Sequence, residues 1–126
     1  MSIPPQLVAD VEAAREAGHC VTIHDESPRF FVIFNDLELP DWCAPRSARL
    51  MMMADYQYPM SALDMFWTDP HIQTASGGWP QYADQFEQHL NSTSWQRWSW
   101  HYQWDPARHN VLSHLEVFFD RLARGS

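Results

Sequence analysis

The last third of the chain carries the clearest pattern of hydrophobic and polar positions. From residue 111 to residue 122, apolar residues recur three or four positions apart, with polar side chains between them, as on a helix that packs one face on a core. Asp105 can accept the free amides of a first turn, and Pro106 suits the first helical position, so we expect the helix to start there. The apolar stripe consists of Val111, Leu112, Leu115, Phe118, Phe119 and Leu122.

The first half of the chain predicts one helix followed by four strands. A proline pair and Gly18 bound a short amphipathic helix over residues 4–17. In the segments that follow, apolar and polar residues alternate or the residues are almost all apolar. These segments are also rich in β-branched and aromatic residues, which favour strands. The expected strands are residues 19–24, 29–34 with an extension to 39, 48–56, and 63–68.

The pattern weakens between this strand region and the last helix. Residues 71–94 contain two adjacent glycines and a proline, and only residues 82–90 could form one or two helical turns. Loops of this length are uncommon in compact domains and are often functional. Residues 95–104 hold four tryptophans and look too irregular for an amphipathic helix or an alternating strand. The order of these expected elements along the chain predicts an α+β fold. It consists of an N-terminal helix, a four-stranded antiparallel meander, a long irregular loop and a C-terminal helix that crosses the sheet.

Composition narrows the class of protein. A length of 126 residues predicts one domain, residues 1–126. The formal charge of −8 and the scattered positions of the eight basic residues, all of them arginine, argue against nucleic-acid binding. No apolar run is long enough for a membrane span, and no signal peptide is visible. With two cysteines, the chain is expected to be cytoplasmic with reduced thiols.

Five short motifs follow one another along the chain. They are Tyr58-Pro59, Leu63-Asp64-Met65-Phe66, Asp69-Pro70-His71, Trp95-Gln96-Arg97-Trp98-Ser99 with His101, and Trp104-Asp105-Pro106. In this order and at these distances they resemble the ubiquitin-conjugating enzymes, and more narrowly their prokaryotic branch, family E. The resemblance covers nearly the whole chain and implies a protein of a bacterial ubiquitin-like modification pathway. The partners that it implies are a ubiquitin-like protein, an activating enzyme and a deconjugating metallopeptidase, and no cofactor is expected.

The chain departs from that family at the residue that carries its chemistry. Family members hold the ubiquitin-like protein as a thioester on a cysteine several residues before the Trp-x-Pro motif, but here no cysteine follows Trp67. Cys20 and Cys43 match no motif position and do not inherit the role. The asparagine of the family's His-Pro-Asn motif is also absent, which leaves no evident side-chain donor for the oxyanion of acyl transfer.

Ser99 and His101 are the candidate catalytic residues. Ser99 is the nucleophile-type residue nearest to the family's cysteine position, with Ser94 as a weaker candidate of the same kind. In an extended chain, side chains two positions apart project to the same face, so the imidazole of His101 could accept the serine proton. An oxyester would then replace the thioester. In the alternative interpretation, Ser99 satisfies a backbone group and His101 packs among the tryptophans.

A non-catalytic scaffold that binds the ubiquitin-like protein or its activating enzyme is the second hypothesis. Tryptophan and arginine are typical anchors of protein interfaces, although each tryptophan could equally fill the core. The candidate partner-binding residues are Trp95, Arg97, Trp98, Trp100, Tyr58 and Pro59.

Two further kinds of site receive little support from the sequence. His109 and His114 lie five positions apart, roughly 140° around a helix, which is not a usual ligand spacing, so no metal site is predicted. Asp64 and Asp69 could act as acid and base, but aspartates beside strand ends are mostly solvated or turn-forming.

Overall fold

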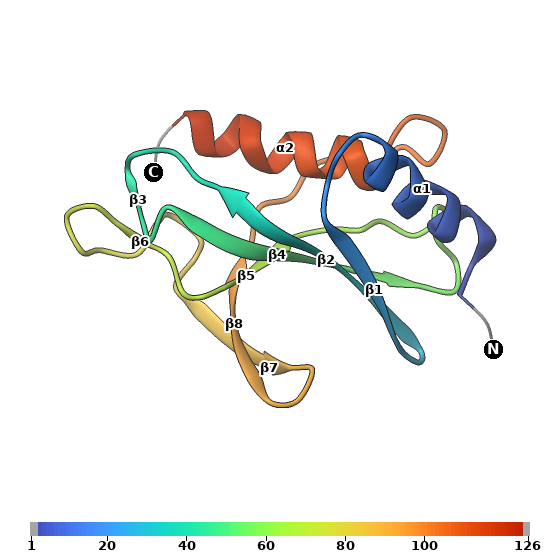
Figure 1. The fold of residues 1–126 in the computed structure, drawn as a ribbon, viewed down its shortest axis with the longest axis horizontal. Helices are drawn as coiled ribbons and strands as arrows, with labels where there is room; N and C mark the ends of the chain where they lie inside the picture. Colours follow the sequence, from blue (N-terminus) through green and yellow to red (C-terminus); the bar gives the residue numbers. More distant parts are fainter. Residues whose placement is uncertain (1–2, 125–126) are drawn as a thin grey trace.

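The computed structural model describes residues 3–124, and in that range a six-stranded sheet carries two helices on one face (Figure 1). The helices are α1, Pro5–Glu16, and α2, Val111–Ala123. The strands of this sheet, in chain order, are β1 Val21–Glu26, β2 Arg29–Glu38, β4 Ser47–Asp55, β5 Phe66–Asp69, β7 Gln85–His89 and β8 Thr93–Trp98. Two short strands, β3 Cys43–Ala44 and β6 Gln73–Thr74, form a separate pair.

The strands lie side by side in the order β1-β2-β4-β5-β8-β7, and every neighbouring pair is antiparallel. The first four form the meander expected from the sequence. The α+β class, the N-terminal helix and the C-terminal helix over the sheet are therefore confirmed. The β7–β8 hairpin extends the meander beyond β5, and the sequence did not predict it.

The central strand β2 is buried on both of its faces. Phe30, Val32 and Phe34 belong to the core that α1 and α2 cover. Phe31 and Ile33 alternate with them and belong to a second, smaller core on the opposite face. A strand buried on both sides needs no polar positions, which explains the nearly continuous apolar run in this part of the sequence.

On the face away from the helices, the sheet curls so that the edge strand β7 comes close to β2 and covers part of this face. His89, at the end of the edge strand β7, has its ring centroid 5.7 Å from that of Phe31, although β4, β5 and β8 separate β7 from β2. Figure 1 shows the β7–β8 hairpin on the side of the sheet opposite α2. The second core under this curl consists of Phe31, Ile33, Met51, Trp67 and Trp95.

Two expectations for the tryptophan-rich region and the loop before it are wrong. Residues 82–90 form no helical turns, since β7 occupies their second half, and residues 95–98 are part of strand β8. Trp95 is buried on one face of β8, whereas Gln96 and Trp98 are buried on the other. The alternation that marks a half-buried strand is therefore absent.

The fourth strand of the meander begins at Phe66, three residues later than predicted. Met65 has a φ of 61°, a left-handed conformation that ends the irregular segment before the strand.

Helix α2 begins at Val111, five residues after the predicted start. The Asn110 side chain accepts the amide of Ser113 at 2.9 Å, and the Ser113 hydroxyl accepts the amide of Asn110 at 2.8 Å, which is a capping box. Asp105 accepts the amide of Ala107 at 3.0 Å, so the Asp-Pro signal caps only a single turn. The extended backbone of Asn110 separates this turn from the helix.

Candidate functional site

An exposed histidine–carboxylate pair lies between the start of β5 and the segment that follows β8. Nδ1 of His101 is 2.8 Å from Oδ1 of Asp64, and the two side chains are 58% and 48% exposed. Because the carboxylate can only accept, His101 Nδ1 carries the hydrogen of this bond, and Nε2 is the nitrogen that can take a proton from a reacting group. A carboxylate that orients an imidazole in this way is the arrangement used in general acid–base catalysis.

Helix α2 fixes the backbone that carries His101. The guanidinium of Arg121 donates to the main-chain oxygen of His101. Its Cζ also lies 5.8 Å from the centroid of the Trp100 ring, within the range of a cation–π contact. The segment after β8 is irregular, yet it is attached to a helix at the position of the histidine.

A buried imidazole on α2 connects the two segments that carry the pair. Nε2 of His114 lies 3.0 Å from the carbonyl oxygen of Met65, and Nδ1 lies 2.6 Å from the hydroxyl of Tyr102. Since the carbonyl only accepts, Nε2 carries the proton and Nδ1 accepts from Tyr102. The ring stacks on Phe66 with centroids 4.1 Å apart.

Burial keeps this imidazole neutral. It lowers the pKa of His114 to about 4, although the hydrogen bond to Met65 and the charge of Asp64 act in the opposite direction, and nearby His109 lowers the pKa further. Burial likewise raises the pKa of Tyr102, so its hydroxyl stays protonated and can donate.

The structure brings His101 to Asp64 and not to Ser99. Ser99 lies just after β8, where its Oγ accepts from Nε of Arg97 at 3.2 Å and its amide donates to the carbonyl of Tyr82 at 2.9 Å. Within residues 3–124 the structure records no hydrogen bond between the side chains of Ser99 and His101. The side chain of Ser99 thus contacts the side chain of Arg97, and its backbone bond is made by its own amide. His101 is exposed and does not pack among the tryptophans.

The tryptophans expected as interface anchors lie in the core. Trp95 and Trp98 are fully buried, and Trp100 is 7% exposed. Arg97 is half-buried and pairs with Glu87 at 2.6 Å. These four residues therefore fill or border the core in this structure, as the core-filling alternative for the tryptophans predicted.

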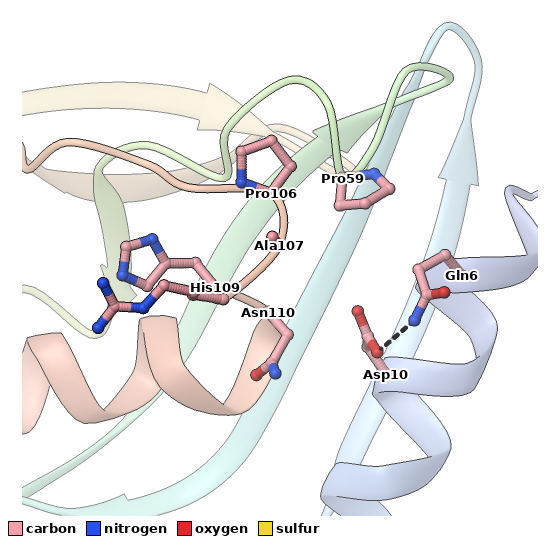
Figure 2. A pocket seen from close by; sticks show the side chains of 8 residues that line it. Gln6, Asp10, Pro59, Pro106, Ala107, His109 and Asn110 are labelled. Atoms are coloured by element: carbon pink, nitrogen blue, oxygen red, sulfur yellow. Dashed lines mark hydrogen bonds between the residues drawn. The ribbon is translucent and has the colours of Figure 1, made fainter.

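The Tyr-Pro and Trp-Asp-Pro motifs meet in space. Nε1 of Trp104 donates to the carbonyl of Pro59 at 2.7 Å, and the Tyr58 hydroxyl donates to Asp10 of α1 at 2.5 Å. Tyr58 is buried, and its burial together with Asp10 raises its pKa. Of the Tyr-Pro motif, only Pro59 lines a surface pocket. Figure 2 shows that pocket between α1 and the loop before α2. It is lined by Gln6, Asp10, Pro59, Pro106, Ala107, Arg108, His109 and Asn110.

Gln96 has a structural role that its sequence motif does not indicate. Its amide group donates to the carbonyls of Ile72 and Ala83 at 2.9 and 2.8 Å. Its oxygen accepts the amide of Ile72 at 2.6 Å and the hydroxyl of Thr68 at 3.1 Å. The side chain is fully buried and ties the loop between β5 and β7 to the sheet. It is therefore committed to the fold and is not a spare donor for an oxyanion.

The remaining chemical candidates lie apart from the Asp64–His101 pair. Asp69 forms an ion pair with Arg49 at 2.6 Å, whereas Asp64 is bonded to His101, so the two aspartates have different partners. Cys43 is buried, which raises its pKa to about 11, and Cys20 is exposed next to the edge strand β1. Residues 3–124 contain no group of three or more His, Cys, Asp or Glu side chains that could hold a metal ion. No helix of the described chain is long and apolar enough to cross a membrane.

A helix-flanked antiparallel meander, with motifs that meet at the start of the last helix, places the chain in the class of ubiquitin-conjugating-like proteins. The model of one family in this class, prokaryotic E2 family E, matches residues 7–125, and the chain belongs to that family. Membership implies that the protein works with a ubiquitin-like protein and its activating enzyme. A search of curated proteins and a search of solved structures gave no match.

Proposed function

We propose that this protein is an acyl carrier in a bacterial ubiquitin-like modification pathway and that it uses an oxyester in place of the family's thioester. In this proposal Ser99 is the nucleophile, His101 is the general base and Asp64 orients the imidazole. The hydrogen bond of 2.8 Å between His101 and Asp64 is the observation that carries it. The free thiols of Cys20 and Cys43 are in keeping with a cytoplasmic protein.

The proposed step is a transfer of the acyl group from sulfur to oxygen. Oγ of Ser99 attacks the carbonyl carbon of the thioester that links the ubiquitin-like protein to its activating enzyme, while Nε2 of His101 takes the hydroxyl proton. The carbon–sulfur bond then breaks, and the imidazolium returns its proton to the departing thiolate. The products are a Ser99 ester and a free thiol on the activating enzyme. A metallopeptidase of the same pathway would remove the modifier from its final target.

The proposal requires Nε2 of His101 to reach the Ser99 hydroxyl when the activating enzyme is bound. The two residues are separated by one position in the segment that leaves β8, and His101 is exposed and bonded to Asp64 through Nδ1 only. A serine needs such a base because its hydroxyl is a weak nucleophile at neutral pH. General-base catalysis typically contributes about 100-fold to 10,000-fold in rate.

The test is to incubate the protein with the activating enzyme, the ubiquitin-like protein and ATP, and to analyse adducts by gel and intact mass. The expected adduct survives thiol reductant, is cleaved by mild base and is absent from S99A. S94A tests the weaker candidate serine, whose Oγ lies 3.1 Å from Nε2 of His71, and should keep the adduct. An adduct that thiol reductant removes, or one that S99A retains, would contradict the serine ester.

A non-catalytic scaffold is the second candidate, and one surface cluster favours it. Trp79, Tyr82 and Phe86 are 43%, 61% and 40% exposed. His71 and Trp79 pack on Phe86, with ring centroids 4.5 and 5.0 Å away, and Phe86 lies on the edge strand β7. Exposed aromatic side chains of this kind are typical anchors of protein interfaces.

The scaffold is tested by binding measurements on the same components without ATP. For a scaffold, the W79A/F86A double variant should bind the activating enzyme or the ubiquitin-like protein at least about tenfold more weakly, a loss of about 1.4 kcal/mol. M60A removes another exposed apolar side chain and should bind normally. Normal binding by the double variant would rule out this surface, and a serine adduct would favour the carrier over the scaffold.

A further inference from the structure

We propose that His114 is the positioning residue of the Asp64–His101 pair, and that it sets the geometry of the pair from inside the core. The catalytic meaning of this inference rests on the proposed function, but the positioning itself does not. His114 touches neither member of the pair. It acts through the residue that follows each of them in the sequence.

The first connection is to the segment that carries Asp64. Met65 follows Asp64, and its carbonyl oxygen accepts the hydrogen of His114 Nε2 at 3.0 Å. Met65 has a φ of 61°, which is costly for a residue that carries a Cβ and persists only where the surroundings fix it. The hydrogen bond from a buried ring supplies such a constraint, and the turn directs the Asp64 side chain toward His101.

The second connection is to the segment that carries His101. Tyr102 follows His101, and its hydroxyl donates to Nδ1 of His114 at 2.6 Å. This segment has no regular secondary structure of its own. The contacts that hold it near α2 include this hydrogen bond and the donation from Arg121 to the His101 carbonyl.

One rigid ring therefore spans two segments that are 37 positions apart in the sequence. The ring is fully buried and stacked on Phe66, so it has little freedom to adjust. Both of its nitrogens are engaged by partners of opposite character, a donor and an acceptor, which only the neutral Nε2–H tautomer can satisfy. A neutral imidazole can bridge a carbonyl and a hydroxyl in this way, because one of its nitrogens donates a hydrogen bond and the other accepts one.

The test uses the tautomer of His101 as a direct readout, measured by NMR on the full chain with ¹⁵N-labelled histidine. In the unchanged protein, the neutral ring of His101 should carry its proton on Nδ1, because that atom donates to Asp64. Y102F removes the hydrogen bond from Tyr102 to His114 and keeps the imidazole. H114F removes both hydrogen bonds of His114 and replaces the imidazole with a ring of similar shape. In each variant, His101 should shift toward the Nε2–H tautomer, as it should in D64N. Y82F changes an exposed tyrosine and should leave the tautomer unchanged.

A transfer assay gives an independent second readout. Y102F and H114F should slow formation of the adduct at saturating activating enzyme, by roughly 100-fold for H114F, with an unchanged half-saturating concentration. A folded Y102F protein that keeps the Nδ1–H tautomer of His101 would overturn the inference, even if H114F failed to fold. If the tautomer shifts as expected and the unchanged protein forms no adduct, the positioning role stands and the proposed function fails.

Discussion

His114 and Met65 are 49 positions apart in the sequence, yet a 3.0 Å hydrogen bond joins the imidazole of one to the backbone of the other. The left-handed conformation of Met65 costs roughly 1 to 2 kcal/mol, and a buried hydrogen bond of this kind offsets a similar amount. The packing of α2 on the sheet is thereby linked to the conformation of the exposed residues beside Asp64.

Removal of the charge on Asp64 should impair transfer without impairing binding. In D64N the imidazole of His101 loses the carboxylate that orients it, so the rate of adduct formation should fall roughly 100-fold. Single-turnover kinetics with the charged activating enzyme measure this rate. D69N is the control, because Asp69 is paired with Arg49 and not with His101, and its rate should stay within about twofold of the unchanged protein. Equal losses in both variants would contradict a specific role for Asp64.

The stability of the protein should fall as the pH decreases from about 6.5 to about 4.5. The pKa of His114 is lowered in the folded state to about 4, so between these values the unfolded chain binds more protons than the folded one. Tyr102 is hydrogen-bonded to this ring, and the charges of Asp64 and His109 act on it. The expected loss in the free energy of unfolding is roughly 2 to 3 kcal/mol, measured by urea denaturation at a series of pH values. H114F should lower stability at pH 7 but flatten its dependence on pH in this window. An equally steep dependence in H114F would assign the effect to other groups.

Replacement of Gln96 by methionine should destabilise the protein by about 3 kcal/mol. The side chain of methionine has a similar size, but it leaves the amide and carbonyl of Ile72 and the carbonyl of Ala83 without their partner in the core. Chemical denaturation gives the free energy of unfolding. Q88M changes an exposed glutamine on β7 and should differ from the unchanged protein by no more than about 0.5 kcal/mol. A neutral Q96M would show that the loop between β5 and β7 is held by other contacts.

The start of α2 can be located by two alanine substitutions. N110A removes the capping box and should cost about 1 kcal/mol in the free energy of unfolding. D105A removes only the cap of a single turn, so its cost should be smaller. Denaturation curves of both variants, measured side by side, decide the order. The reverse order would restore the helix start that the sequence alone suggested.

The sequence predicted the layers of the fold because α2, buried on one face, and β2, buried on both, each leave a regular pattern of apolar residues. The apolar stripe on α2 and the apolar run of β2 both indicate which side chains are buried in the core. The β7–β8 hairpin was missed for a physical reason: Trp95, Gln96 and Trp98 are all buried, so β8 lacks the alternation by which a strand is recognised. The later start of α2 was missed because Asp105 and Asn110 are both good caps, and only tertiary contacts select between them.

The candidate site could be predicted only in part. His101 was identified from its motif, but its contact with Asp64 spans 37 positions, and one sequence carries no signal of such a pairing. His114 was considered only as a metal ligand beside His109, because the sequence does not show which groups a histidine on a helix will contact. Its role depends on the two hydrogen bonds that a buried imidazole can form, and these become visible only once α2, β5 and the segment after β8 are placed together.

The contact between Phe31 and His89 also bears on the order in which the chain folds. When only the residues up to β5 have been synthesised, the underside of the meander has nothing to cover it, and Phe31, Ile33 and Met51 face solvent. The hairpin that shields them comes last among the strands, about sixty residues after Phe31, and contacts over such separations form slowly. We therefore expect a nascent chain that ends before residue 85 to be prone to aggregation, and synthesis of the last hairpin to relieve it.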